Sequence, residues 1–278
     1  NKTLNIALAG TGVGKSLFMC HMASACLLRS KNVLYVTMEM SEEKIAERID
    51  ANCLNLNIKD IGDLPQVMFK SKIADLQKRT TGKVVIKEYP TASAHAGHFR
   101  SLLNELKLKK SFIPDIIFVD YLNICASSRY KGHIVNFYTY VKAIAEELRG
   151  LAVEFDLPIV SATQTTRAGF GSSDPDLTDT SESFGLPATA DLMFALISSE
   201  ELEAEGRLKV KQLKNRYNDP TSNRSFVVGI DRAKMKLFDV ADSTSAVYDA
   251  AQEEDAVDAY DTVKQNQARL SKFAEWNV

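Results

Sequence analysis

Five short runs of mostly apolar, β-branched residues alternate with longer segments of helical periodicity as far as residue 163. The runs are LNIAL (4–8), NVLYVT (32–37), KVVIKE (83–88), DIIFVD (115–120) and PIVSAT (158–163). The segments between these runs are long enough for helices that connect parallel strands, and are longer than the turns of hairpins. The alternation therefore predicts an α/β fold, in which a mostly parallel sheet is sandwiched by helices on both faces.

The pattern changes after residue 190. Before it, the clearest helical segment is 134–156, whose apolar residues recur at spacings of three and four: Val141, Ile144, Ala145, Leu148, Leu151, Ala152 and Phe155. After it, the runs DLMFALI (191–197), RLKVKQL (207–213), SFVVGI (225–230) and MKLFDV (235–240) follow without long helices. These runs predict antiparallel strands at one edge of the sheet. We expect one domain over residues 1–240 and an acidic C-terminal tail over 241–278.

Charge is unevenly distributed in this chain of 278 residues, whose net charge is −2. Between Arg207 and Lys236 there are nine lysines and arginines against two aspartates, and between Asp239 and Asp261 there are eight acidic residues and no basic one. The ordinary interpretation is a solvated hairpin followed by a disordered or loosely helical tail. No apolar run approaches the roughly 20 residues that span a bilayer. The sequence thus predicts a soluble cytoplasmic protein with no membrane contact.

The cysteines lie in apolar or helical patterns, without the close pairing of a zinc site or the density of a disulfide framework. They are Cys20, Cys26, Cys53 and Cys125. Since a free cysteine packs as a small apolar residue, we expect all of them to be reduced packing residues without a catalytic role.

The segment IALAGTGVGKS (6–16) resembles a phosphate-binding loop between a strand and a helix. Lysine there reaches phosphate oxygens, the next hydroxyl binds Mg²⁺, and glycines let backbone N–H groups converge on phosphate. The strict pattern has glycine where this chain has Ala9, the smallest possible departure. We expect ATP to bind at this loop, through Gly10, Gly12, Val13, Gly14, Lys15, Ser16 and Leu17.

Three polar residues at or just beyond the ends of expected strands complete this site. Asp120 ends an apolar strand and is a second candidate for Mg²⁺, although an aspartate can also simply cap a strand. Glu39 lies between two methionines in an apolar run, where a glutamate is costly to bury without a partner or a function, and we expect it to activate water. Gln164 is the candidate γ-phosphate sensor, although taken alone it would more often be an exposed loop residue.

The ordered motifs GTGVGKS, VTMEMS, IIFVDYL, SATQ and TSESFGLPATADLMFALI resemble the motor domain of the DnaB-type hexameric replicative DNA helicases, most closely those of T-even-type bacteriophages. The resemblance covers about residues 1–240. It implies a RecA-like P-loop NTPase that forms a homo-hexameric ring around single-stranded DNA, hydrolyses ATP between neighbouring subunits and unwinds forked duplexes. For a full-length member it also implies primase and a helicase loader as partners and, if the protein is phage-encoded, the host cytoplasm as its location.

The resemblance also assigns residues in the basic segment. KNRYND provides Lys214 and Arg216 at the spacing of a lysine and an arginine that reach into the neighbouring subunit's ATP site. The alternative is that both residues only make a hairpin soluble. In the loops at 125–136 and 165–185, which would line the channel of the ring, the candidate DNA contacts are Arg129, Lys131 and Arg167. Each of these is almost as well explained as an ordinary solvated residue.

Two other functions remain open. A RecA-type recombinase would share the phosphate loop, the magnesium aspartate and the sheet, but would act as an open filament on single-stranded DNA. The MEMS motif and the LPATADLMFALI segment fit the helicase better. A non-enzymatic nucleotide-binding module would require an incomplete site, whereas all the expected site residues are present.

Overall fold

The computed structural model describes residues 1–130, 136–165, 185–219 and 224–240. Residues 1–238 form one compact unit and residues 239–278 another. The division into a motor domain ending at residue 240 and an acidic tail remains a prediction, because the tail lies outside the described residues.

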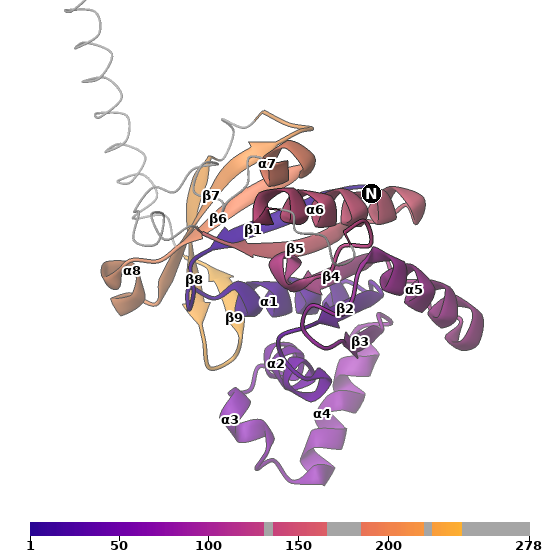
Figure 1. Ribbon diagram of the computed structural model, residues 1–278. Coiled ribbons are helices and arrows are strands. Elements are labelled where there is room, and N and C mark those ends of the chain that lie inside the picture. The colour runs from indigo at the N-terminus through magenta and orange to yellow at the C-terminus, as the bar shows by residue number, and fades with distance from the viewer. Residues whose placement is uncertain (131–135, 166–184, 220–223, 241–278) are drawn as a thin grey trace, which may run out of the picture. The chain divides into compact units, whose positions relative to one another are not determined.

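A nine-stranded sheet runs through the first unit in the order β3-β2-β4-β5-β1-β6-β7-β8-β9 (Figure 1). Its strands are β1 (Leu4–Ala9), β2 (Val33–Thr37), β3 (Val84–Glu88), β4 (Ile116–Asp120), β5 (Ile159–Gln164), β6 (Leu192–Ile197), β7 (Arg207–Asn215), β8 (Ser225–Asp231) and β9 (Lys236–Asp239). The first six strands in chain order pair in parallel, and β7 pairs antiparallel with both β6 and β8. The predicted α/β class with an antiparallel C-terminal edge is confirmed.

The direction of β6 differs from the expectation. The run 191–197 was expected to be antiparallel, but β6 lies parallel to β1, with Ala7 opposite Phe194. The chain between β5 and β6 is long enough to cross the sheet and return in the same direction. This crossover lacks a long helix in its described part, so the sequence pattern does not reveal it.

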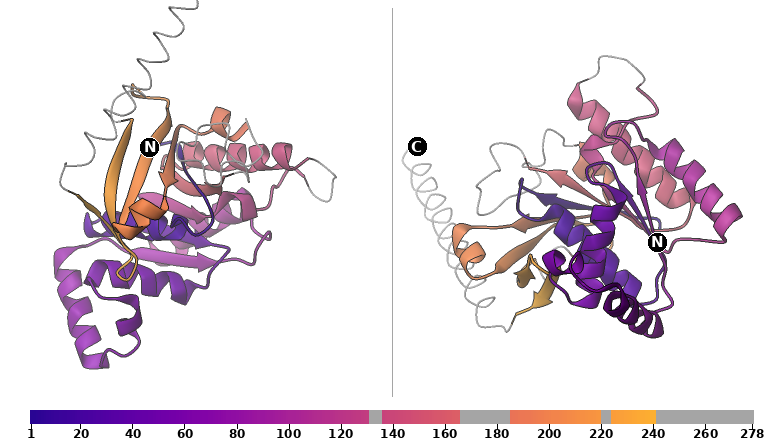
Figure 2. Two further views of the ribbon diagram at one scale, coloured as in Figure 1. Left: turned by 90° about the vertical axis from the view of Figure 1, so that its left-hand side faces the viewer. Right: turned by 90° about the horizontal axis from the view of Figure 1, so that it is seen from below.

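Helices cover both faces of the sheet (Figure 2). Helices α1 (Lys15–Leu28), α2 (Glu42–Leu54) and α4 (Gln66–Arg79) share one hydrophobic core with the sheet, and α5 (Ala96–Lys110), α6 (Phe137–Glu154) and α7 (Gly185–Thr189) share the other. Strand β2 divides its residues between the two cores, because successive side chains of a strand point to opposite faces. Shorter helices are α3 (Ile58–Ile61), η1 (Leu122–Ile124) and α8 (Glu200–Ala204).

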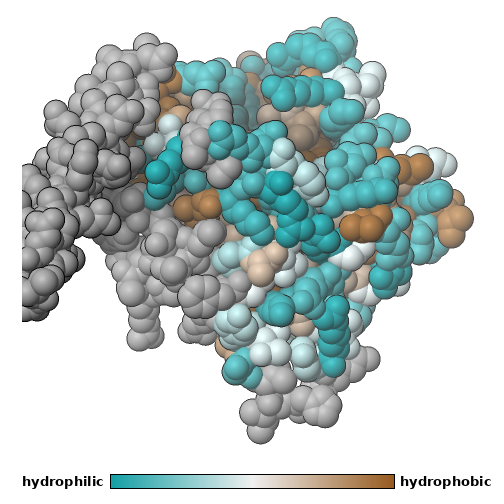
Figure 3. Space-filling view, turned by 90° about the horizontal axis from the view of Figure 1, so that it is seen from above, coloured by the Kyte–Doolittle hydropathy of each residue, from teal (hydrophilic) through white to brown (hydrophobic). Residues whose placement is uncertain are grey.

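Helix α6 confirms the helical pattern expected over 134–156 within the described residues. It starts after Asn136, whose side-chain oxygen accepts a hydrogen bond from Thr139 N at 2.8 Å. The expected apolar residues up to Ala152 are buried. Seen from above, the surface is mostly hydrophilic with separate hydrophobic spots (Figure 3). Of the helices that the structure describes, none has the length and apolar character needed to cross a membrane.

The cysteines give a first testable prediction. Cys20, Cys53 and Cys125 are buried and Cys26 is partly buried, and all are free thiols. Burial raises the pKa of the Cys20 thiol to about 12, so almost no reactive thiolate forms near neutral pH. We expect iodoacetamide to leave the three buried thiols of the native protein unmodified and to label all four in denaturant, measured by mass spectrometry. Rapid native labelling of Cys20 would contradict a packing role.

Candidate nucleotide-binding site

The parallel strands bring the expected site residues to one edge of the sheet. The register pairs Ala9 with Gln164 and Thr37 with Asp120, so β1, β2, β4 and β5 end side by side. The phosphate loop follows β1, and Glu39 lies two residues beyond β2. In open α/β sheets, ligands bind at the carboxyl ends of the strands. The fold therefore assembles a candidate site from four separate segments.

Ala9 is accommodated because it is the last residue of β1 rather than part of the turn. Its side chain is fully buried, and its backbone φ is negative, as expected in a strand. The left-handed backbone occurs instead at Gly12 (φ 81°) and Gly14 (φ 126°), where a side chain would be strained. Gly14 is also the N-cap of α1. The unpaired N–H groups of the first helical turn and the helix dipole make this end of α1 favourable for a phosphate.

Lys15 is held by carbonyl oxygens of the loop. Its Nζ donates to Gly10 O at 3.1 Å and to Ala9 O at 3.5 Å, and it lies 5.9 Å from the centre of the Tyr121 ring. Burial lowers the pKa of Lys15, while the negative charges of Glu39 and Asp120 oppose that shift. A partly desolvated ammonium interacts strongly with an anion, so Lys15 is well suited to bind a phosphate oxygen.

Asp120 is fully buried at the end of β4. Its Oδ2 accepts a hydrogen bond from the Tyr35 hydroxyl at 2.8 Å, while its Oδ1 is buried without a hydrogen-bond partner. Burial raises the pKa of Asp120, and the nearby hydroxyls of Tyr35 and Ser16 oppose that rise. A buried carboxylate oxygen without a partner, next to a serine hydroxyl, fits an oxygen-preferring cation such as Mg²⁺.

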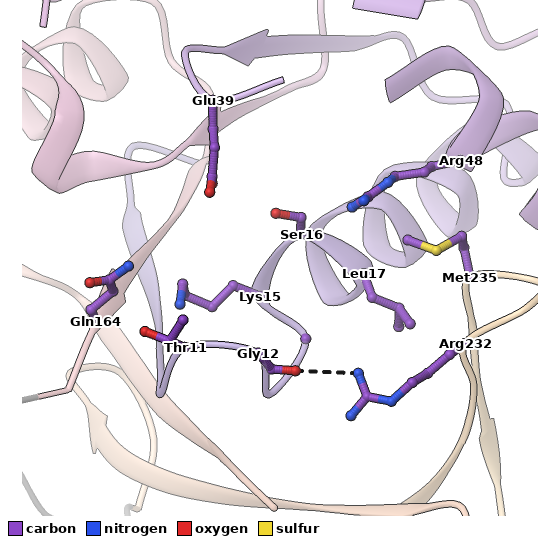
Figure 4. A pocket seen from close by; sticks show the side chains of 11 residues that line it. Thr11, Gly12, Lys15, Ser16, Leu17, Glu39, Arg48, Gln164, Arg232 and Met235 are labelled. Atoms are coloured by element: carbon purple, nitrogen blue, oxygen red, sulfur yellow. Dashed lines mark hydrogen bonds between the residues drawn. The ribbon is translucent and has the colours of Figure 1, made fainter. Parts of the chain in front are cut away.

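The expectation that Glu39 is buried in an apolar run is wrong, because its side chain is exposed. The chain leaves the sheet after Thr37, whose hydroxyl donates to Met40 O at 2.8 Å and accepts from Met40 N at 3.1 Å. This turn buries Met38 and directs Glu39 toward the space above Lys15 and Ser16 (Figure 4). An exposed carboxylate can accept a proton from water without any cost of burial.

Gln164 is partly buried at the end of β5 and faces Lys15 across the site (Figure 4). Its Nε2 donates to the Tyr121 hydroxyl at 3.3 Å. Tyr121 thus contacts two expected site residues, since Lys15 lies over its ring. Tyr121 directly follows Asp120 in the chain, but no sequence motif predicts a role for it in the site.

These residues surround a cavity of about 320 Å³, within the usual range for small-ligand sites. Its lining contains seven of the expected residues, namely Gly12, Gly14, Lys15, Ser16, Leu17, Glu39 and Gln164 (Figure 4). It also contains two arginines that the sequence did not predict, Arg48 and Arg232, together with Thr11 and Met235. Among the expected loop residues, Gly10 and Val13 do not line the cavity.

The two additional arginines come from different elements of the fold. Arg48 lies on α2, and its guanidinium faces Ser16 (Figure 4). Arg232 follows β8, donates to the carbonyl oxygens of Gly12 and Val13 at 3.4 Å, and lies 3.6 Å from a Glu203 carboxylate oxygen. Arg48 could have been inferred from its place on a helix that begins just after Glu39. Arg232 lies in the basic segment between Arg207 and Lys236, but nothing in the sequence distinguishes it from the other cations of that segment.

Comparison with known families identifies the family of the chain. The family model described as "DnaB-like helicase C terminal domain" matches residues 1–227. The chain belongs to this family.

Similar proteins agree with this membership. The chain is 47% identical to the DnaB-like replicative helicase of Enterobacteria phage T4, over 87% of this chain and 52% of that protein. It is 25% identical to the replicative DNA helicase DnaB of Helicobacter pylori, over 70% of this chain and 39% of the relative. The chain thus spans about half the length, or less, of these curated relatives.

Solved structures support the fold. A DnaB-like replicative helicase, studied with its interactions with primase, superposes with a TM-score of 0.72 at 17% identity, over 86% of this chain and 58% of that chain. An ATPase domain superposes with the same TM-score and identity, over 85% of its own length. The predicted RecA-like architecture of this DnaB-like domain is therefore confirmed.

Lys214 and Arg216 do not line the cavity of their own DnaB-like domain. Lys214 Nζ donates to the carbonyl oxygens of Pro187 and Ala188, and Arg216 donates to Ala188 O at 3.1 Å. Arg216 also lies 3.1 Å from the buried carboxylate of Asp191. Both side chains therefore contact α7, and Arg216 also contacts Asp191 just before β6.

Among the three candidate DNA contacts, only Arg129 lies in the described part of the chain; Lys131 and Arg167 lie outside it. Arg129 donates to Glu146 on α6. Glu147, next to Glu146, accepts from the hydroxyls of Ser127 and Ser128 at 2.6 and 2.8 Å. In this DnaB-like domain, hydrogen bonds and an ion pair therefore hold the start of the loop at 125–136 against α6. A DNA phosphate would have to compete with Glu146 for Arg129.

Proposed function

We propose that this chain is the ATP-driven motor of a replicative DNA helicase, which forms a hexameric ring on single-stranded DNA and unwinds forked duplexes. The observation that carries the proposal is the convergence of Lys15, Ser16, Glu39 and Gln164 on one cavity, beside the buried Asp120, in a member of the DnaB-like family. Each of these groups has a role in hydrolysing a nucleoside triphosphate.

In this mechanism the backbone N–H groups of the loop and the Lys15 ammonium bind the β- and γ-phosphates of ATP. Glu39 orients the attacking water and accepts its proton, and Gln164 donates to a γ-phosphate oxygen and responds to its loss. Ser16 and Asp120 would hold Mg²⁺, which neutralises charge that develops on the phosphates. Arg48 and Arg232 add positive charge to the lining of the cavity.

We propose that Lys214 and Arg216 act in a neighbouring subunit's site. They lie away from the cavity of their own chain, and Arg216 retains an exposed guanidinium, with 37% of its side chain accessible. An arginine supplied by a neighbour stabilises charge on the transferring phosphoryl group. The ATP site is then complete only when subunits assemble.

DNA binding and partners belong to the same proposal. Arg129, Lys131 and Arg167 are the proposed contacts to DNA phosphates, and six copies would give the channel a positive potential from few charges per subunit. A similar solved protein is described with its interactions with primase, which supports primase as a partner of the full-length protein. A helicase loader and a location in the cytoplasm, that of the host for a phage protein, complete the proposal.

Asp120→Asn tests the proposed magnesium site. We expect the affinity for Mg²⁺ in the presence of ATP to fall by about 100-fold or more, because even residues that only orient a metal ligand are worth roughly 10- to 100-fold. The readout is the increase in melting temperature produced by Mg²⁺ with a non-hydrolysable ATP analogue, compared with the analogue in EDTA. Asp115→Asn, an exposed aspartate just before β4, is the control. A wild-type magnesium response in Asp120→Asn would exclude this ligand.

The proposed function is tested by steady-state ATPase measurements at several protein concentrations, with and without single-stranded DNA. We expect the rate per subunit to rise with concentration and with DNA, because both favour assembly of the shared site. Nucleotide binding with no hydrolysis under any condition would indicate a non-enzymatic module. Hydrolysis without displacement of a strand from a forked duplex, together with DNA strand pairing, would indicate a recombinase.

A further inference from the structure

Asp191 is a buried carboxylate remote from the phosphate loop. Only 1% of its side chain is exposed, at the start of β6. Its Oδ2 accepts from Leu4 N at 3.0 Å and from Arg149 Nε at 3.1 Å, and its Oδ1 accepts from the second Arg149 nitrogen at 3.1 Å. Burial raises the pKa of Asp191, but the hydrogen bonds from Arg149 and Leu4 N outweigh burial and hold this pKa below its ordinary value. Arg149 on α6 and Leu4 N on β1 therefore already satisfy this carboxylate.

Arg216 is a second guanidinium on the same carboxylate. One of its terminal nitrogens lies 3.1 Å from Asp191 Oδ1, and the other donates to Ala188 O at 3.1 Å. The backbone is fixed as well, because Arg216 N donates to Asp191 O at 2.9 Å. Lys214 is held by carbonyl oxygens of the same helix, α7. The side chains of both residues are thus held at α7, and that of Arg216 also contacts Asp191 while remaining 37% exposed.

The charges in this cluster do not cancel. One carboxylate faces two guanidinium groups, so the Asp191–Arg149–Arg216 cluster has a net positive charge. Arg149 makes the two-pronged contact, which is the stronger geometry for an arginine and a carboxylate, whereas Arg216 makes a single contact. Arg149 therefore neutralises Asp191. Arg216 keeps its charge available for another anion and can release its contact without leaving a buried carboxylate unpaired.

We propose that Arg149, acting through Asp191, is a positioning residue for Arg216, which it directs toward the phosphate of a neighbouring subunit; this inference rests on the proposed shared ATP site. Without Arg149, Arg216 would be the one guanidinium left in contact with this buried carboxylate among the described residues. Arg216 would then be drawn toward Asp191 and away from the neighbour's phosphate. Hydrolysis would fall, although the cavity of the substituted subunit is unchanged.

Arg149→Gln tests the proposal, with Arg100→Gln as the matched control. Arg100 makes a similar two-pronged contact with Glu154, also on α6, but lies away from Asp191. We expect the kcat for ATP hydrolysis to fall by about 10- to 100-fold in Arg149→Gln, the scale of effect that misplacement by about 1 Å produces. We expect the Kd of a fluorescent ATP analogue to remain within about twofold of wild type. Arg149→Lys, which keeps a charge beside Asp191, should lose less activity.

Mixed assemblies separate positioning from a general loss of structure. A Lys15→Ala subunit cannot bind ATP productively but still offers an intact Arg216 to its neighbour. We expect it to restore hydrolysis when mixed with Arg149→Gln subunits, whereas Arg216→Ala subunits should not. An unchanged kcat in Arg149→Gln, an equal loss in Arg100→Gln, or no recovery with Lys15→Ala would each overturn the proposal.

The same set of variants distinguishes this inference from the proposed function. Full activity of Arg216→Ala alone would exclude the shared site, and with it both proposals. If the kcat for ATP hydrolysis is lost in Arg216→Ala but unchanged in Arg149→Gln, the shared site stands and only the role of Arg149 is excluded. Far-ultraviolet circular dichroism shows whether Arg149→Gln is folded. If it is not, Arg149→Lys replaces it in the test. The proposal then still requires that Arg149→Lys has a reduced kcat and that mixing with Lys15→Ala subunits restores hydrolysis.

Discussion

Arg216→Ala is expected to lower the kcat of ATP hydrolysis by about 10³- to 10⁵-fold, the range that arginines supplied to phosphoryl-transfer sites contribute. The fold should be retained, because Asp191 keeps its contacts with Arg149 and with Leu4 N. Nucleotide binding should also persist, since Arg216 lies outside the cavity of its own chain. The measurements are steady-state turnover with single-stranded DNA and binding of a fluorescent ATP analogue.

Two controls make this result specific. Arg224→Ala removes an exposed arginine of the same basic segment and should leave turnover near the wild-type value. Mixing Arg216→Ala with Lys15→Ala subunits should restore activity that neither variant has alone, because a productive site then forms between the two kinds of subunit. If Arg216→Ala turns over ATP normally, the arginine does not contact the transferred phosphate.

Glu39→Gln is the second large effect, with an expected loss of roughly 10²- to 10⁴-fold in kcat, the usual contribution of a general base. The substitution keeps the shape of the side chain and removes only its ability to take a proton. Since Glu39 is exposed, the melting temperature should not change. Binding of the ATP analogue should be close to that of wild type, because the phosphate contacts come from Lys15 and the loop.

Glu43→Gln is the matched control for this variant. Glu43 is an exposed glutamate in the first turn of α2 and does not line the cavity. We expect it to retain wild-type turnover. Comparable losses in Glu39→Gln and Glu43→Gln would point to general electrostatics rather than proton transfer, and retained activity in Glu39→Gln would assign the base to another group.

Much of the fold could be predicted because parallel strands and their helices leave local, periodic patterns. The runs at 32–37, 83–88 and 115–120 became β2, β3 and β4, and residues 137–154 became α6. The direction of β6 was not predictable in this way. It depends on whether the chain between β5 and β6 crosses the sheet, and the apolar pattern of a strand is the same in either direction.

The phosphate loop could be located from sequence because its chemistry depends on spacing within one short segment. The ends of the strands could be located for a similar reason. A polar residue after an apolar run marks the carboxyl end of a strand, where parallel sheets bind their ligands. Burial could not be read in the same way. Glu39 lies in an apolar run yet is exposed, because the turn made by Thr37 and Met40 takes it out of the sheet.

The chemical groups of the site, their order and the strands that carry them could be predicted from the amino-acid sequence, because they follow from local spacing and periodicity. Which distant groups meet depends on how the strands and helices pack. The packing places Arg232 on the cavity, Tyr35 against Asp120, and Arg149 with Arg216 on Asp191. These contacts join residues that are far apart in the chain and are set by strand order, register and helix packing, none of which leaves a signal in the neighbouring sequence.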